Sequence, residues 1–331
     1  KRKVDFGIWL EPEMVNPQSE LYQKHPDWII TQPKRTPILG RHQEILDLTR
    51  PEVQAFEWQV IDKTLRPNPD ISYVKWDCNR YITQPGSGYL QPAEQSHLWI
   101  DYNWALYRLM ERFSKEFPNV MAMLCAGGSG RVDYGALPYF HSFWPSDNTD
   151  PLGRIKIQWG FSHFFPARTI SAHVTRMGKR HLKLAIDVAL SGAFGIDLAL
   201  DKATAEERVQ IADAVKLYKA SIRPLVMQGE LYRLVSPYEH PMASLSYVST
   251  DKNDAVVYLY QIQDGSVPQV ILGGLDARKN YRVEEVGLPK GSTSRFPGHG
   301  KIFSGAELMS TGIANPLNAQ FESAILLLKT Q

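Results

Sequence analysis

Tyr73-Val74-Lys75-Trp76-Asp77-Cys78-Asn79-Arg80 joins a strand pattern to a charged pair, and the rest of the fold can be worked out from this stretch. Its β-branched and aromatic residues predict a strand over 71–76, because such side chains suit a pleated, half-buried surface. Side chains alternate along a strand, so Lys75 and Asp77 share one face. The pair is either a surface ion pair or a site in which Lys75 lowers the pKa of Asp77 and keeps it ionised.

Two further strand patterns also end in polar loops. Residues 120–125 form an apolar run that opens into Ala126-Gly127-Gly128-Ser129-Gly130-Arg131. Residues 139–144 lead into Trp144-Pro145-Ser146-Asp147-Asn148-Thr149-Asp150, which again places a carboxylate after aromatic strand residues. Strands that end in such loops are typical of an α/β barrel, whose chemistry lies at the C-terminal ends of its strands.

Strands and helices alternate from residue 6 to residue 220 and predict an α/β fold, a (β/α)8 TIM barrel. About six βα units are present, with strands expected at 6–10, 71–76, 120–125, 139–144, 169–172 and 194–200. A closed barrel needs eight, and the chain opens directly on a strand expected to be buried, so we expect the barrel to be truncated at its N-terminus. From residue 244, alternating runs without helices predict an antiparallel β-sandwich. We therefore place a partial barrel domain at 1–232 and a C-terminal β-sandwich domain at 233–331.

Composition narrows the function. The chain has 331 residues and a formal net charge of +2 without long basic blocks, so nucleic acid is not an expected partner. No apolar run could cross a membrane, and we expect a soluble protein, cytoplasmic or else periplasmic or secreted. Cys78 and Cys125 are expected to be free thiols. The spacing of His141, His163 and His173 fits no standard metal site, so neither a metal nor a cofactor is predicted.

Several side chains allow two interpretations. Glu11 and Glu13 end the first strand and could be catalytic, although the surrounding prolines also suit a structural loop. Arg41 is either a substrate clamp or a surface ion-pair partner. The glycine run after residue 126 lacks the P-loop ending and more plausibly lets the backbone approach a ligand closely. Thr204 and Glu207 predict a capping box that opens a helix with Val209, Ala212 and Val215 on its buried side.

Two carboxylates at separate strand ends fit glycoside hydrolysis. Five segments of the chain, in order, resemble glycoside hydrolase family 36, the bacterial and fungal α-galactosidases. They are Phe6-Gly7-Ile8-Trp9-Leu10-Glu11-Pro12-Glu13-Met14, Leu39-Gly40-Arg41, Lys75-Trp76-Asp77-Cys78-Asn79, Cys125-Ala126-Gly127-Gly128-Ser129-Gly130-Arg131 and Trp144-Pro145-Ser146-Asp147-Asn148-Thr149-Asp150. The resemblance covers most of the family's barrel and its C-terminal β domain.

This resemblance implies a retaining α-galactosidase that works by double displacement, with Asp77 as the nucleophile and Asp147 as the acid/base. It implies α-galactoside oligosaccharides of the raffinose and melibiose type as substrates, and a homo-oligomer, a tetramer in the intact family member. The residues implied to line the galactose pocket are Arg41, Lys75, Asn79, Cys125, Gly127, Gly128 and Trp144.

The sequence also departs from the family. The family's N-terminal β-sandwich and first two barrel strands, which carry a galactose-binding Asp-Asp pair, have no counterpart here. We therefore expect the parent protein to be active and this chain to be weakly active or inactive. The alternatives are a galactosyl transferase of the same fold, in which an acceptor sugar replaces water, and an inactive sugar-binding fragment.

Overall fold

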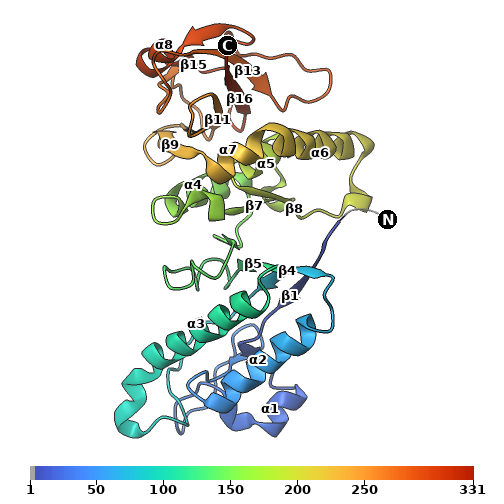
Figure 1. Cartoon of the computed structure of the whole chain (residues 1–331), viewed down its shortest axis with the longest axis vertical. Helices are drawn as coiled ribbons and strands as arrows, with labels where there is room; N and C mark the ends of the chain where they lie inside the picture. The colour runs from blue at the N-terminus through green and yellow to red at the C-terminus, as the bar shows by residue number, and fades with distance from the viewer. Residues whose placement is uncertain (1–3) are drawn as a thin grey trace. The chain divides into compact units, whose positions relative to one another are not determined.

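The computed structural model describes residues 4–331, which form two compact units divided after Asp147 (Figure 1). The first unit contains an open parallel sheet with helices, and the second combines helices with an antiparallel sheet. Each unit is described by itself below.

The first unit is organised around β4, which occupies an inner position in the sheet order β1-β4-β5-β6. All three strand pairings are parallel. The predicted strand 71–76 is confirmed. The helices and strands of this unit are β1 (Phe6–Leu10), β2 (Met14–Val15), α1 (Glu20–Lys24), β3 (Glu44–Ile45), α2 (Pro51–Leu65), β4 (Ile71–Trp76), the 3-10 helix η2 (Pro92–His97), α3 (Leu98–Glu116), β5 (Met121–Leu124) and β6 (Ser142–Phe143).

Two helices of this unit bury apolar residues, which in α2 are Val53, Trp58, Ile61 and Leu65. Pro51 occupies the first turn of α2, where its missing N–H costs nothing. In α3, Leu106, Leu109, Met110 and Phe113 are all buried and follow helical spacing. Phe113 meets the buried ring of Trp76 edge-on, with 5.9 Å between the ring centroids, so α3 packs directly on the strand that ends at Asp77.

The prediction of a buried first strand is wrong. β1 lies at the edge of the sheet, and the side chains of Phe6 and Trp9 are 62% and 51% exposed. Strand propensity reports how well side chains fit a pleated surface and does not report the position of a strand within its sheet, so an edge strand and a central strand can look alike in sequence. The strand predicted at 139–144 also shrinks to the two residues of β6, because its proline-containing neighbours run as a loop.

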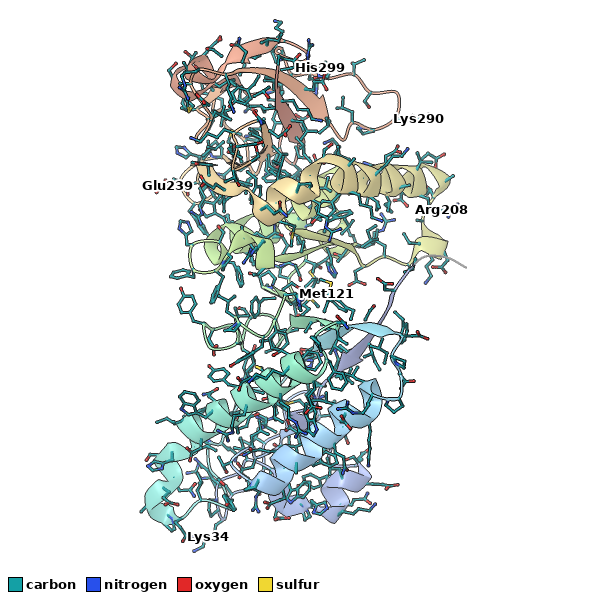
Figure 2. The ribbon with its side chains drawn as sticks, viewed as in Figure 1. Lys34, Met121, Arg208, Glu239, Lys290 and His299 are labelled. Atoms are coloured by element: carbon teal, nitrogen blue, oxygen red, sulfur yellow. The ribbon has the colours of Figure 1, made fainter. Side chains whose placement is uncertain are left out.

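The second unit begins with helices around a two-stranded parallel sheet and ends in a six-stranded antiparallel sheet of order β14-β13-β16-β11-β10-β9. Its elements are α4 (Pro151–Phe161), β7 (Ser171–Val174), α5 (Leu182–Ala189), β8 (Ala193–Ile196), α6 (Ala205–Leu217), the π-helix η6 (Tyr218–Ile222), α7 (Arg223–Gln228), β9 (Glu230–Val235), β10 (Met242–Val248), β11 (Asp254–Gln261), β12 (Gln269–Val270), β13 (Asn280–Val286), β14 (Ile302–Ser304), α8 (Gly305–Ser310), β15 (Ile313–Ala314) and β16 (Ser323–Thr330). Figure 2 labels Lys290 on the loop between β13 and β14.

Four tyrosine hydroxyls join the antiparallel sheet and η6 to the C-terminal end of α5. Tyr247, Tyr258 and Tyr260 donate to the backbone carbonyls of residues 191, 190 and 187 at 2.8, 2.8 and 3.1 Å. Tyr218 donates to the carbonyl of residue 192 at 3.0 Å. The last carbonyls of a helix have no partner inside the helix, and here buried phenols supply it. One core thus spans the helices and the sheet, and the domain boundary predicted at residue 232 stays a prediction.

The capping box of α6 is confirmed: Glu207 N donates to Thr204 Oγ1, and Thr204 N donates to the Glu207 carboxylate. Its predicted buried side is wrong. Ile211 and Ala214 are buried, whereas Val209 is 45% exposed. The apolar residues of α6 are spread around the helix, so periodicity alone selects the wrong face.

Candidate functional site

Asp77 lies directly after β4, and its carboxylate is surrounded by hydrogen-bond donors although only 4% of the residue is exposed. Trp9 Nε1 donates to Oδ2 at 3.0 Å, and the backbone N–H of Cys78 donates to Oδ1 at 3.0 Å. The side chains of Asn79 and Cys125 also lower the pKa of this carboxylate. The donors come from three strand ends, which the parallel register brings to one edge of the sheet.

These partners keep Asp77 ionised. Burial alone raises the pKa of a carboxyl, but the hydrogen bonds from Asn79, Trp9 and Cys125 and the charge of Lys75 bring the pKa of Asp77 below its ordinary value. Lys75 Nζ lies 3.8 Å from Asp77 Oδ2. The predicted direction of the pKa shift is confirmed, but the hydrogen bonds contribute more than the lysine does.

Asp147 is connected to Asp77 through two side chains. Lys75 Nζ, beside Asp77, lies 5.4 Å from the centre of the Trp144 ring. Trp144 Nε1 in turn donates to Asp147 Oδ1 at 3.1 Å. Asp147 is exposed, whereas Asp77 is buried. One buried, ionised carboxylate therefore lies beside Lys75, and one solvent-accessible carboxylate lies beside Trp144.

The glycine loop contacts both Asn79 and the turn that carries Asp147. Gly127 and Gly128 have φ values of 57° and 96°, a region that favours glycine. A Cβ on Gly128 would lie 3.0 Å from Ser146 Cα and 3.5 Å from Asp147 N, so the loop touches the backbone that carries Asp147. The thiol of Cys125, just before this loop, is buried, and burial raises its pKa to about 12.

Asn79 ties the end of β4 to the glycine loop and to the turn after β1. Its Oδ1 accepts from Gly127 N at 3.2 Å, and its Nδ2 donates to Glu11 Oε1 at 2.7 Å. The backbone N–H of Asn79 donates to the same Glu11 oxygen at 3.0 Å. Lys75, Asn79, Cys125, Gly127, Gly128 and Trp144 are thus brought together with Asp77 and Asp147, as the sequence predicts.

Arg41 makes no direct contact with the Asp77 carboxylate in the described residues. It is exposed in a tight turn between Gly40 and Gln43, and its φ of 54° lies in the left-handed region. Within residues 4–331, no hydrogen bond or ion pair joins Arg41 to Asp77. The turn itself is held by the buried side chain of Arg80, which donates to Gln43 O at 3.0 Å and pairs with Glu44 at 3.4 Å. The role of Arg41 as a substrate clamp stays a prediction.

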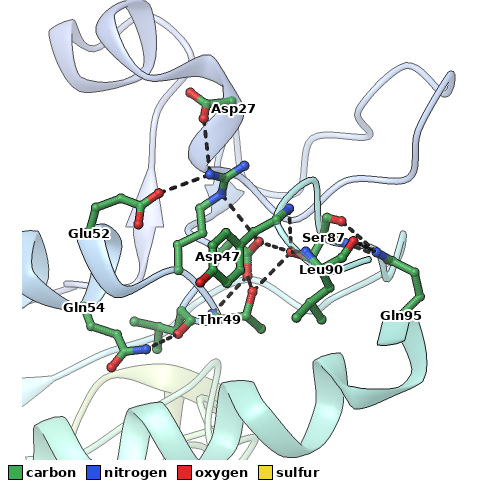
Figure 3. Close-up of polar contacts among 11 residues, drawn as sticks. Asp27, Asp47, Thr49, Glu52, Gln54, Ser87, Leu90 and Gln95 are labelled. Atoms are coloured by element: carbon green, nitrogen blue, oxygen red, sulfur yellow. Dashed lines mark hydrogen bonds and ion pairs between the residues drawn. The ribbon is translucent and has the colours of Figure 1, made fainter. Parts of the chain in front are cut away.

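A second buried carboxylate anchors the loop that follows Asp77 (Figure 3). Asp47 Oδ1 accepts from the backbone N–H and hydroxyl of Thr49, and Asp47 Oδ2 accepts from the Ser87 hydroxyl. Gln95 Nε2 donates to the backbone oxygens of Ser87 and Leu90 at 2.8 and 2.7 Å. The loop from β4 to η2 is therefore fixed at its far end by buried hydrogen bonds.

Trp9 is a site residue that sequence reasoning missed, because the first strand was interpreted as core. Two features of the sequence could have identified it. Trp9 stands near the end of a strand that is followed by Glu11 and Glu13, and its side chain combines an apolar ring with an N–H donor. In the structure Trp9 pairs in register with Lys75. That register determines that its indole reaches Asp77.

Both cysteines are free and buried. Across residues 4–331, no group of three or more His, Cys, Asp or Glu side chains is arranged to hold a metal ion. Within the same range, none of the helices combines the length and apolarity needed to span a bilayer.

Known proteins resemble this chain along its whole length. It is 38% identical over 322 residues to the α-galactosidase AgaA of Geobacillus stearothermophilus. The aligned region covers 95% of this chain and 42% of AgaA. It is 34% identical over 341 residues to α-galactosidase 2 of Hypocrea jecorina, covering 99% of this chain and 42% of that protein. The chain therefore spans less than half the length of these relatives.

Solved structures show the same fold. The crystal structure of the GH36 α-galactosidase AgaA matches with a TM-score of 0.90 at 37% identity, covering 99% of this chain and 45% of AgaA. A variant of AgaA solved with raffinose matches with a TM-score of 0.90 at 36% identity and the same coverage. The α-galactosidase of Lactobacillus brevis matches with a TM-score of 0.89 at 32% identity, covering 99% of this chain and 44% of that protein. The predicted partial TIM barrel followed by a C-terminal β domain is thereby confirmed.

Two family models match consecutive parts of the chain. The model described as Melibiase matches residues 1–229, and the model of the glycosyl hydrolase family 36 C-terminal domain matches residues 242–328. The first match alone covers more than half of the chain and includes every residue of the candidate site. The chain therefore belongs to the melibiase family, within glycosyl hydrolase family 36.

Proposed function

We propose that this chain carries the catalytic carboxylates of a retaining α-galactosidase, with Asp77 as nucleophile and Asp147 as acid/base. The observation that supports the proposal best is the contrast between the two environments. Asp77 is buried, and its pKa is lowered, whereas Asp147 is exposed on the indole N–H of Trp144. Paired carboxylates in different environments are how one site supplies both a nucleophile and a proton donor.

In the proposed reaction, Asp77 attacks the anomeric carbon while Asp147 protonates the departing glycosidic oxygen. A β-linked glycosyl-enzyme ester forms on Asp77. Asp147, now deprotonated, takes a proton from water, and that water displaces Asp77 to release α-galactose. The exposure of Asp147 suits this second step, because the attacking water must reach it.

The proposed substrates are α-galactosides of the raffinose and stachyose type, since variants of the related AgaA have been solved with both sugars. Cys125, Gly127 and Gly128 form the proposed wall that closes on galactose and leaves no room for an N-acetyl group. Arg41, Lys75, Asn79 and Trp144 are proposed to contact the sugar.

The test is hydrolysis of 4-nitrophenyl α-galactoside, with the product anomer followed by proton NMR. Retention predicts that α-galactose appears first and that Asp77→Ala abolishes turnover. Azide should restore reaction to Asp77→Ala and give β-galactosyl azide, because the small anion replaces the missing nucleophile. If β-galactose appears first, the double-displacement mechanism is wrong. If galactose is transferred to an added sugar faster than to water, the chain is a transferase.

A further inference from the structure

The turn after β1 carries two acids, Glu11 and Glu13, and neither has a part in the proposed reaction. Together they accept hydrogen bonds from the two residues that follow Asp77, the proposed nucleophile. Glu13 is fully buried and accepts from Cys78 Sγ at 2.7 Å, and Glu11 accepts from the backbone and the side chain of Asn79. The most informative contacts are those of Glu11, because they lead through Asn79 to the reacting carboxylate.

We propose that Glu11 is a positioning residue, whose carboxylate fixes the amide of Asn79 and, through that amide, the orientation of the Asp77 carboxylate. The inference rests on the proposed role of Asp77 as nucleophile and deepens it.

The first step of the argument concerns the orientation of the Asn79 amide. An asparagine amide can be turned by half a rotation, which exchanges its oxygen and its nitrogen. Here the neighbours allow one orientation. Gly127 N–H is a donor 3.2 Å from Oδ1, and the Glu11 carboxylate, which can only accept, is 2.7 Å from Nδ2. The turned amide would place donor against donor and acceptor against acceptor.

The second step concerns what the fixed amide does. Nδ2 carries two hydrogens, one of which goes to Glu11 Oε1. The side chain of Asn79, two residues after Asp77, also makes the largest of the contributions that lower the pKa of Asp77. Glu11 thus decides where the Asn79 amide points, and that amide acts in turn on Asp77; we call this arrangement the relay.

The third step explains why the outer residue is a carboxylate. Glu11 faces three donors: Asn79 N and Nδ2 on Oε1, and Gln43 Nε2 on Oε2 at 2.6 Å. A glutamine at position 11 keeps one acceptor oxygen for Asn79 but turns an NH2 toward Gln43. The buried Oε1 of Gln43 has no hydrogen-bond partner in the described chain, so Gln43 can turn its own amide and accept. Glu11→Gln should therefore preserve the relay, whereas Glu11→Ala removes it.

Losing the charge of Glu11 and losing the oriented Asn79 amide should shift the pKa of Asp77 in opposite directions, and this makes the inference testable. The groups facing Asp77 are Lys75, the indole of Trp9, the amide of Asn79 and the thiol of Cys125. Cys78 lies beside them, with Glu13 behind it. Removing the negative charge of Glu11 by itself lowers the pKa of Asp77. Losing the oriented Asn79 amide raises it.

The experiment is carbon-13 NMR of aspartate carboxyl groups in the full chain, with Asp77→Asn to assign the signal. Glu11→Ala should raise the pKa of Asp77, and the matched variant Glu11→Gln should leave it unchanged or lower it. In an Asn79→Ala background, Glu11→Ala should no longer raise it. If Glu11→Ala does not fold, Glu11→Leu repeats the test with the side-chain volume retained.

A pKa of Asp77 that is unchanged or lowered in Glu11→Ala would overturn the inference, as would an equal rise in the Asn79→Ala background. Hydrolysis assays on the same samples separate this outcome from failure of the proposed function. Glu11→Ala should lower kcat/KM about tenfold or more, because a displaced nucleophile loses its attack geometry. If the wild-type chain has no α-galactosidase activity, the NMR titration still decides the role of Glu11.

Discussion

The contact between Gly128 and the Asp147 loop yields the sharpest test of the proposed acid/base. A Gly128→Ala substitution would place Cβ 3.0 Å from Ser146 Cα, and both groups belong to backbone that no rotamer change can move. Ordinary carbon–carbon contacts lie at about 3.5–4.0 Å, so the Asp147 loop must retreat by roughly 0.5–1 Å. The left-handed φ of 96° adds strain of about 1–2 kcal/mol in the free energy of folding.

The retreat should affect proton donation more than nucleophilic attack. Misplacing a catalytic group by about 1 Å can cost on the order of 100-fold in rate. Raffinose releases an alkoxide that needs a proton, whereas 4-nitrophenolate leaves easily without one. We therefore expect Gly128→Ala to lower kcat/KM for raffinose about 100-fold and for 4-nitrophenyl α-galactoside less than about tenfold.

Gly291→Ala is the matched control. Gly291 has a φ of 83° with no atom within 4 Å of a Cβ built on it, so the substitution adds backbone strain without a collision. It should cost about 1–2 kcal/mol in urea unfolding and leave both kcat/KM values unchanged. Equal losses on the two substrates in Gly128→Ala would refute the reasoning, because a displaced acid must discriminate between leaving groups.

Three further substitutions test single contacts. Trp9→Phe removes a donor from Asp77, whose pKa is lowered in the folded protein and should rise, so the acidic limb of kcat/KM should move to higher pH; an unmoved limb would contradict the pKa assignment. Tyr260→Phe leaves a buried helix-end carbonyl without its donor and should cost about 1–2 kcal/mol in urea unfolding, whereas Tyr238→Phe, at an exposed hydroxyl, should cost almost nothing. Thr204→Ala removes the cap of α6 and should lower the unfolding free energy by about 1 kcal/mol; no change would mean that water replaces the cap.

Local sequence patterns determined several secondary-structure elements of this protein. The strand before Asp77, the proline start of α2, the buried stripe of α3 and the capping box at Thr204 are all readable from short stretches of sequence. Each depends on interactions within a few residues: alternation, helical periodicity or a side chain that bonds to its own backbone. The two carboxylates were identifiable for the same reason, because Asp77 follows β4 directly and Asp147 lies in the short polar turn after β6.

What surrounds the carboxylates was decided only by the tertiary structure. The register between β1 and β4 aligns Trp9 with Lys75 and brings its indole to Asp77, and nothing within either segment specifies that alignment. The relay from Glu11 through Asn79 joins residues separated by 68 positions in the chain. The exposure of β1 likewise depends on its neighbours in the sheet. Residue type determines which interactions a side chain can make, whereas strand order and register determine which partner is within reach.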